Sequence, residues 1–304
     1  MAQQGKFRTN LEYCVARASL GFFSRLPLSW ALSLGRAAGK LGLLSSKLRR
    51  TGRRNLELAF PELSSNEREK LLRATFENLG RNLGVFSHFK TEPTQGWSRL
   101  INSNGLEQLS AARERGRGMI LFTGHVGAWE LSSFGLSLFD QPLRFLVRRI
   151  DNPKVERLID QYRTCRGNRT IDKQFAAREM LQTLQSGGTL GILVDLNTLD
   201  REAVFVDYFG VKAATTFIVA KLALRTGAEV FPVFAPWDET QKKFRLEVGA
   251  PLLVERTEDE AADTVRLTQA MTSVVESYVR RYPDQWLWIH RRWKTRPPGD
   301  KEIY

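Results

Sequence analysis

The segment that most constrains the fold runs from Gly118 to Glu130, with the sequence Gly-Met-Ile-Leu-Phe-Thr-Gly-His-Val-Gly-Ala-Trp-Glu. Its apolar run, residues 119–122, predicts a buried β-strand. Gly124 and Gly127 flank His125 and predict a turn that leads into a helix. The sequence therefore places His125 where a strand ends and a helix begins.

The spacing between His125 and Glu130 limits how the two side chains can meet. A helix turns about 100° per residue, so positions i and i+5 lie on different faces of a regular helix. The pair can meet only if His125 lies in the turn and Glu130 in the first helical turns, with Gly127 absorbing the bend. An imidazole oriented by a carboxylate beside the positive end of a helix has the parts of a general base. The alternative is an ordinary strand-to-helix turn with a solvated histidine, because this spacing is common.

Length and charge limit the class of protein. The chain has 304 residues, which is enough for one large α/β domain or two small ones. A 42% hydrophobic and 26% charged composition predicts a globular protein and excludes a disordered one. Lys and Arg number 46 against 33 Asp and Glu, and the formal net charge of +13 predicts a polyanionic partner: nucleic acid, an anionic lipid surface or an acidic protein.

Cysteine and histidine usage argues against metal and disulfide frameworks. Cys14 and Cys165 are far apart and form no Cys-x-x-Cys or Cys/His cluster, which suits a reducing cytoplasmic compartment. The three histidines have no His-Glu-x-x-His or comparable ligand spacing. We therefore expect neither a metal nor a cofactor.

Residues 11–45 are rich in Leu, Phe, Ala, Gly and Trp, but basic side chains interrupt them. The longest uncharged run, from Leu26 to Gly35, is well short of the roughly 20 apolar residues that a spanning helix needs. The sequence predicts one or two helices lying in a membrane interface, with the basic side chains toward lipid phosphates. The side chains expected to face inward are Phe22, Phe23, Leu26 and Trp30. An amphipathic helix packed on the rest of the protein is the alternative.

A dense basic run follows at residues 47–54. It extends the positive surface and could bind lipid phosphates or a nucleic-acid backbone, or it could simply be solvated. We divide the chain accordingly into an N-terminal membrane-associated helical segment, residues 1–50, and one larger domain, residues 51–304.

Strand and helix patterns alternate through the middle of the chain. Strands are predicted at residues 142–149 and 189–195, and helices at residues 155–162 and 176–185. Further strands at residues 229–236 and 244–250 complete the sheet, and a long helix at residues 264–282 follows it. This alternation predicts a single α/β domain with a central, mostly parallel sheet flanked by helices, and ligands bound at the carboxyl ends of the strands. Arg148, Arg149 and Asp195 end their strands at the edge where His125 lies.

The tail from Tyr282 to Pro297 interleaves aromatic and cationic residues. Stacking and phosphate contacts to a nucleic acid are one interpretation. A membrane interface or a surface for substrate phosphates is another, since tryptophan favours that boundary and arginine binds phosphate bidentately. The third is that Trp286 and Trp288 pack in the core and the arginines are solvated.

Several ordered motifs together resemble a known family. They are Asn55-Leu-Glu-Leu-Ala-Phe-Pro-Glu62, Gly124-His125 to Glu130, Arg166 before Gly167-Asn168, Asp195, Val204-Phe-Val-Asp-Tyr-Phe-Gly210 followed by Ala-Ala-Thr-Thr, and Gln285-Trp-Leu-Trp-Ile-His-Arg-Arg-Trp-Lys-Thr-Arg-Pro297. From about Asn55 to Pro297 the chain resembles the late lipid A acyltransferases, within the lysophospholipid acyltransferase superfamily. Its N-terminus has more charges than is usual in that family, and Asp195-Leu-Asn197 replaces the more frequent Asp-Gln.

The resemblance implies an enzyme at the cytoplasmic face of the inner membrane. It implies transfer of a fatty acyl chain from acyl carrier protein to a hydroxyl of an anionic glycolipid, a lipid A precursor, with His125 as general base and Glu130 orienting it. We place Asp195 in substrate binding, together with Arg148, Arg149 and Arg166, which would hold lipid or carrier phosphates.

Two alternatives to lipid A acylation stay open at this stage. One is the same chemistry on another glycolipid or phospholipid acceptor, and the other is a non-enzymatic basic protein that binds membranes or nucleic acid. The sequence has no Gly-x-Ser-x-Gly elbow, which favours direct transfer over a serine acyl-enzyme. We expect a membrane-surface partner and no nucleic acid.

Overall fold

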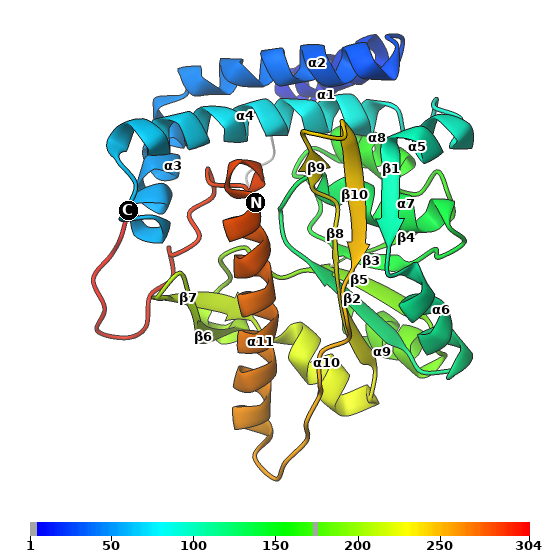
Figure 1. Ribbon diagram of the computed structural model, residues 1–304, viewed down its shortest axis with the longest axis vertical. Coiled ribbons are helices and arrows are strands. Elements are labelled where there is room, and N and C mark those ends of the chain that lie inside the picture. The colour runs from blue at the N-terminus through cyan, green and yellow to red at the C-terminus, as the bar shows by residue number, and fades with distance from the viewer. Residues whose placement is uncertain (1–4, 173–175) are drawn as a thin grey trace.

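The N-terminal part of the chain forms a layer of helices. The computed structural model describes residues 5–172 and 176–304. The layer consists of α1 (Lys6–Phe23), α2 (Leu28–Gly39), the short 3₁₀ turn η1 (Lys40–Leu44), α3 (Ser46–Ala59) and α4 (Ser65–Ser87). Ser64 and Glu67 form a reciprocal capping box at the start of α4. Helices α1 and α2 lie along α4 at the top of the molecule (Figure 1).

Glycines allow α2 and α4 to pack unusually closely. Gly35 and Gly39 of α2 face Gly80 and Gly84 of α4. A Cβ atom on Gly80 would overlap the carbonyl oxygen of Gly35, and a Cβ on Gly39 would overlap the carbonyl oxygen of Phe76. The two helices therefore touch backbone to backbone, which fixes α2 firmly to the rest of the protein.

The side chains of the N-terminal segment that we expected to face inward lie in two different environments. Phe23 is buried in the protein, so its predicted place in a membrane interface is wrong, because α1 packs this side chain against its neighbours. Phe22 and Trp30 remain 53% and 68% exposed. Within the described residues, no helix has the length and apolar content needed to cross a membrane.

A mostly parallel sheet lies below this layer in Figure 1, and the predicted α/β architecture is confirmed. Its strands in spatial order are β1 (Ile101–Asn104), β10 (Lys243–Val248), β8 (Glu229–Phe234), β2 (Met119–Thr123), β5 (Thr189–Leu193), β3 (Arg144–Val147) and β4 (Arg169–Asp172). Strands β1 and β10 are parallel to each other and run antiparallel to β8 and the strands beyond it, and the short β9 (Trp237–Asp238) pairs antiparallel with β10. The carboxyl ends of β2, β5 and β3 consequently meet at one edge.

Helices cover both faces of the sheet. They are α5 (Thr94–Leu100), α6 (Leu106–Glu114), α7 (Trp129–Leu138), α8 (Pro153–Arg163), α9 (Ala176–Gln185), α10 (Ile218–Thr226) and α11 (Glu260–Arg281). The bounds of α9 are those predicted. Helix α11 begins four residues before the predicted start at residue 264, because the Asp259 carboxylate accepts a hydrogen bond from the backbone N–H of Ala262 and caps the helix there.

A β-hairpin separates β5 from α10. No strand is predicted from the sequence in this segment, whereas in the structure β6 (Ala203–Tyr208) and β7 (Val211–Thr216) pair in antiparallel register. Phe209 and Gly210 form the two-residue turn, both with positive φ. The N–H of Phe209 donates to the carboxylate of Glu276 on α11 at 2.7 Å. This long-range contact holds a non-glycine residue in a conformation that local sequence does not reveal.

The aromatic tail lies in the core. Trp286, Trp288 and Trp293 are almost completely buried, so the structure supports the core-packing interpretation of the tryptophans. Arg292 is buried with them and donates to the carbonyl oxygen of Ala214 and the hydroxyl of Thr215. The tail thereby closes over the carboxyl edge of the sheet, beside His125.

Candidate active site

The site begins with the predicted strand, turn and helix. All five residues of β2 are buried, and α7 begins at Trp129. Gly127 has φ +64°, and a Cβ there would overlap the backbone of Ala235 and Pro236. Its N–H donates to the carbonyl oxygen of Gln285 at 2.9 Å. The bend predicted at Gly127 is thus confirmed, and its cause is close contact with β8 and the tail.

Asp195 holds the imidazole of His125. The Nδ1 atom of His125 lies 2.8 Å from one carboxylate oxygen, and the backbone N–H of His125 donates to the other at 2.7 Å. The indole N–H of Trp286 donates to the same second oxygen at 2.7 Å. Burial alone would raise the pKa of Asp195, but the charge of His125 and these three hydrogen bonds lower it to about 2.

Sheet register explains why these two residues meet. Strands β2 and β5 are parallel neighbours, with Thr123 opposite Leu193. His125 and Asp195 each lie two residues beyond that pair, at the same edge of the sheet. The structure therefore places Asp195 beside His125, buried, with both carboxylate oxygens accepting hydrogen bonds from protein donors.

Glu130 has a different partner from the one expected. It lies in the first turn of α7, and its carboxylate accepts hydrogen bonds from the Nε and Nη2 groups of Arg163, at the end of α8. Burial lowers the pKa of Arg163, but the Glu130 carboxylate outweighs that effect and raises it. Among the described residues, the Nδ1 contact of His125 belongs to Asp195, and none joins His125 to Glu130.

A cavity of about 620 Å³ opens beside His125, within the range of small-molecule sites. Its walls are mostly apolar and come from the sheet and from α7, α9 and α10, including Leu121, Leu136, Phe145, Met180, Ile192 and Ile218. Its polar side chains include His125, Glu130, Arg148, Arg163, Asn197 and His290. The arrangement suits a long apolar group with a polar reacting end.

The residues predicted to bind substrate or its phosphates, Arg148, Arg149, Arg166 and Asp195, lie in different environments in the structure. Arg148 lines the cavity, whereas Arg149 is exposed and pairs with Asp172 at 2.7 Å. Arg166 donates to the carbonyl oxygen of Glu92. The sequence reasoning missed Arg163, which lies one residue beyond the helix predicted at 155–162. Its pairing with a carboxylate 33 residues away leaves no local signal.

His290, which received no role from the sequence, also lines the cavity. The backbone N–H of Asn197 donates to its Nε2 atom at 3.1 Å. Burial lowers the pKa of His290 to about 4. In residues 5–172 and 176–304, no three His, Cys, Asp or Glu side chains are grouped in a way that could hold a metal ion.

Comparison with known proteins decides the family. The model of the bacterial lipid A biosynthesis acyltransferases matches residues 4–295. The chain belongs to this family. It is 31% identical to the lipid A biosynthesis lauroyltransferase of Escherichia coli (strain K12), over 92% of this chain and 90% of the relative. It is 26% identical to the lipid A biosynthesis myristoyltransferase of the same organism, over 89% and 82%. The predicted resemblance is thus confirmed.

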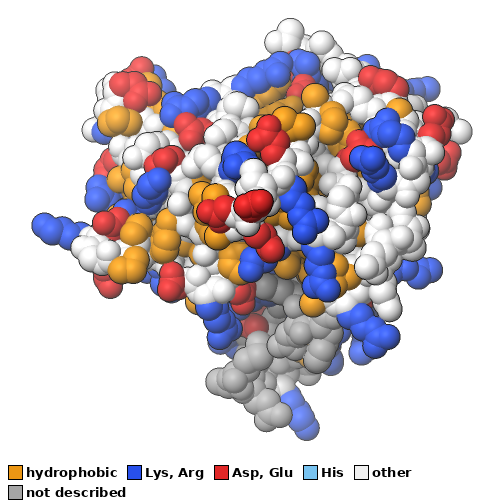
Figure 2. All heavy atoms as spheres, turned by 90° about the horizontal axis from the view of Figure 1, so that it is seen from below, with side chains coloured by type: hydrophobic (Ala, Val, Ile, Leu, Met, Phe, Trp, Pro, Cys, Tyr) orange, Lys and Arg blue, Asp and Glu red, His pale blue; other side chains and the backbone are white. Residues whose placement is uncertain are grey.

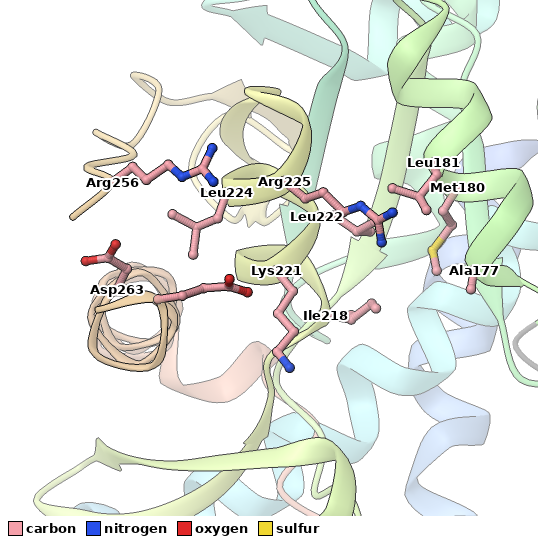
Figure 3. A pocket seen from close by; sticks show the side chains of 11 residues that line it. Ala177, Met180, Leu181, Ile218, Lys221, Leu222, Leu224, Arg225, Arg256 and Asp263 are labelled. Carbon is pink, nitrogen blue, oxygen red and sulfur yellow. The ribbon is translucent and has the colours of Figure 1, made fainter. Parts of the chain in front are cut away.

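The acyltransferase has a second cavity, of about 560 Å³, between α9, α10 and α11. Ala177, Met180 and Ile218 line both cavities. Figure 3 shows Met180 and Ala177 reaching in from α9 and Lys221 and Arg225 from α10. The apolar space beside His125 is therefore bounded by a few side chains with further space behind them.

Proposed function

We propose that this family member transfers a fatty acyl chain to a hydroxyl group of a lipid A precursor, with His125 as the general base. The observation that carries the proposal is the His125–Asp195–Trp286 hydrogen-bond chain at the polar end of an apolar cavity. A carboxylate on Nδ1 leaves Nε2 as the basic nitrogen. The family membership supports the reaction class and the acceptor.

The proposed reaction is direct transfer from a thioester of acyl carrier protein. His125 takes the proton of the acceptor hydroxyl as its oxygen forms a bond to the thioester carbon. The carbonyl electron pair moves onto oxygen. Collapse of this intermediate breaks the C–S bond, and the leaving thiolate receives the proton from His125. A positioned base of this kind contributes roughly 10²- to 10⁴-fold in rate.

The oxyanion of that intermediate needs hydrogen-bond donors. Helix α7 has no side-chain cap, and among the described residues the N–H groups of Trp129 and Glu130 at its start have no hydrogen-bond partner. The positive end of the helix favours the developing negative charge. These N–H groups are the first donors that we propose.

We assign the orienting role to Asp195 in place of Glu130. Both oxygens of Asp195 accept from His125, and its burial makes the ion pair with a protonated His125 strong. Glu130 is proposed to hold Arg163 in the cavity wall. Arg163 and Arg148 then supply positive charge for phosphate groups of the acceptor. Among the described residues, Arg149 and Arg166 do not line the cavity and are therefore weaker candidates; Arg149 pairs with Asp172, and Arg166 donates to the carbonyl oxygen of Glu92.

We propose that the enzyme acts at the cytoplasmic face of the inner membrane. Helix α1 exposes an apolar stripe, formed by Phe7, Leu11, Val15 and Phe22, which recur at helical spacing. Lys6, Arg17 and Arg25 on or beside this helix add positive charge for anionic lipids. We keep residues 1–50 as the membrane-associated segment and residues 51–304 as the acyltransferase domain.

The test is acyl transfer by purified protein from acyl-carrier-protein thioester to a lipid A precursor. His125→Ala and Asp195→Asn are expected to lower kcat by at least about 10²-fold, because the base is lost or held in the wrong tautomer. Glu130→Gln is expected to raise the KM for the acceptor more than it lowers kcat. Full kcat in a folded His125→Ala protein would contradict the proposal.

Product analysis by mass spectrometry separates lipid A from other acceptors. A wild-type protein that acylates only another glycolipid or a lysophospholipid would overturn the acceptor but keep the chemistry. The reverse kinetic pattern, with Glu130→Gln losing kcat and Asp195→Asn retaining it, would restore Glu130 as the orienting residue.

A further inference from the structure

One hydrogen bond determines the tautomer of His290. The backbone N–H of Asn197 donates to Nε2, so this nitrogen is an acceptor and carries no hydrogen. A neutral ring then carries its hydrogen on Nδ1. Within the part of the chain that the structure describes, the Nδ1 atom of His290 has no hydrogen-bond partner. Because His290 lines the cavity beside His125, this N–H is available to a molecule bound there.

The surroundings keep the ring neutral. Burial lowers the pKa of His290 to about 4, against the opposing effect of Asp195. The imidazole therefore stays uncharged near neutral pH. A neutral imidazole with a fixed tautomer can donate a hydrogen bond to a carbonyl oxygen without competing with His125 for a proton.

The chain around His290 is held rigidly. The side-chain amide of the buried Asn55 donates to the carbonyl oxygens of both Trp288 and His290, each at 2.6 Å. Asn197 is tied to the tail on its other side, since its amide oxygen accepts from the N–H of Thr295 at 2.8 Å. Rigid placement of a donor before the reaction is what makes it effective in stabilising a transition state.

His290 and His125 also lie at the same edge of the sheet. Asn197, which holds His290, follows β5 by four residues, and Asp195, which holds His125, follows it by two. An acyl group that reacts at His125 therefore occupies the cavity that His290 also lines.

We propose that His290 is a catalytic residue of the acyl transfer, donating its Nδ1–H to the carbonyl oxygen of the acyl thioester and stabilising the oxyanion. The inference rests on the proposed function. As the acceptor oxygen adds to the carbonyl carbon, the π electron pair moves to the oxygen that His290 contacts. Collapse returns that pair to the carbon and expels the thiolate, and His290 keeps its proton throughout.

Two variants separate this role from a structural one. In His290→Asn, the amide N–H₂ can occupy the place of Nδ1, while the contact to Asn197 is lost. In His290→Gln, the amide oxygen can occupy the place of Nε2 and keep that contact, but the donor at Nδ1 is lost. His290→Leu removes both. The assay is transfer from acyl-carrier-protein thioester to a lipid A precursor under saturating substrates, with kcat and KM determined separately.

The expected result is that His290→Gln and His290→Leu lower kcat by about 10²- to 10³-fold with little change in KM, as when one oxyanion donor is removed. His290→Asn should retain most of the activity. Thr295→Val removes two side-chain contacts of the Asn197 loop but keeps the Thr295 N–H that donates to Asn197, so it is the matched control and should stay within a few-fold of wild type.

Wild-type kcat in His290→Leu would overturn the inference. So would an active His290→Gln with an inactive His290→Asn, because that order identifies the contact to Asn197 as the only role. Both results leave the proposed function intact when wild type is active and His125→Ala is not. A wild-type protein without transfer activity overturns the proposed function and this inference with it.

Discussion

Gly127 sets the direction in which the chain leaves His125. An alanine there would need a left-handed conformation, which costs roughly 1–2 kcal/mol, and its Cβ would overlap the backbone of Ala235. We expect Gly127→Ala to lower the free energy of unfolding by about 2–4 kcal/mol, since strain and overlap add. Urea unfolding measures the loss, and acyl transfer should fall because His125 moves.

Gly116→Ala is the matched control for that substitution. Gly116 has φ +70°, close to that of Gly127, but its Cβ would meet nothing within 4 Å. It should therefore lose only the roughly 1–2 kcal/mol of backbone strain and keep full activity. Equal losses at the two positions would show that the contact with β8 is unimportant.

Asp195 makes stability depend on pH. Its pKa is about 2 in the folded protein against an ordinary value of 3.8. A lowered pKa means that the carboxylate stabilises the fold above about pH 4, and that this contribution, on the order of 2 kcal/mol, is lost as the pH falls through about 2.

Comparing urea unfolding of wild type and Asp195→Asn at pH 6 and at pH 2.5 measures this contribution. The difference between the two proteins should shrink at the lower pH. A difference that stays constant would show that the ion pair with His125 does not stabilise the fold.

For individual residues, the sequence predicted where a side chain lies in the fold better than it predicted which residue that side chain contacts. The apolar run and the flanking glycines place His125 at a strand end, and the strand pattern places Asp195 at the same edge. The partner of His125 depends on which strands are neighbours, because only the adjacency of β2 and β5 brings Asp195 within 2.8 Å. No spacing within one segment contains that information.

The α2–α4 contact is the element whose packing is least tolerant of change. Gly80→Ala gains up to about 1 kcal/mol in helix propensity, but its Cβ would overlap the backbone of Gly35. We expect a net loss of about 1–3 kcal/mol, as in overpacked cores. The melting temperature and urea unfolding report this change.

Gly21→Ala provides the comparison within α1. A Cβ at Gly21 would meet only the end of the flexible Arg25 side chain, at 3.2 Å. This variant should be neutral or stabilised by up to about 1 kcal/mol, from propensity alone. If Gly80→Ala were equally neutral, the close approach of α2 and α4 would not contribute to stability.

Met180 of α9 is one of the side chains between the two cavities. Met180 lines both, so Met180→Ala should open a passage from the cavity beside His125 into the space behind it. We expect the variant to prefer longer acyl chains, with a gain of up to about 0.8 kcal/mol, or roughly fourfold, per added methylene that becomes buried. Competition among acyl-carrier-protein thioesters of different length measures the preference.

Leu181→Ala is the control, because Leu181 lines only the second cavity. It enlarges that space without removing the dividing side chain. A shift in chain length for both variants, or for neither, would exclude Met180 as the boundary of the acyl site.

Regular elements were predictable where local patterns were strong, as in α9, whose helical period ends at glycines. The hairpin was not predictable, because its turn depends on the contact of Phe209 with Glu276 on α11. In α2 and in α4, two glycines are spaced four residues apart in the sequence. Only the packing of the two helices against each other shows that this spacing allows their close approach.

Across the described residues, exposed large apolar side chains are most frequent on the N-terminal helices. Helices α1 and α2 lie at the top in Figure 1, and α1 carries an apolar stripe that faces solvent. The opposite face, seen in Figure 2, has Lys and Arg interspersed with Asp and Glu. A membrane-binding surface is therefore better supported on the N-terminal helices than on that lower face.

Vesicle binding tests this orientation. With a net charge of +13, the protein should bind vesicles that contain phosphatidylglycerol, and added salt should weaken binding because it screens the attraction. The triple variant Phe7→Ser, Leu11→Ser and Val15→Ser should bind at least about tenfold more weakly. It removes three apolar side chains whose burial in the bilayer would contribute several kcal/mol to the free energy of binding. Co-sedimentation measures both effects.

Leu253→Ser is the control for that variant, because Leu253 is 79% exposed, like Phe7 at 82%, but lies outside the N-terminal helices. It should bind as wild type does. If the triple variant retained full binding while salt still abolished it, charge alone would attach the protein to the bilayer. The α1 stripe would then need another role, and the assignment of residues 1–50 as the membrane-associated segment would fail.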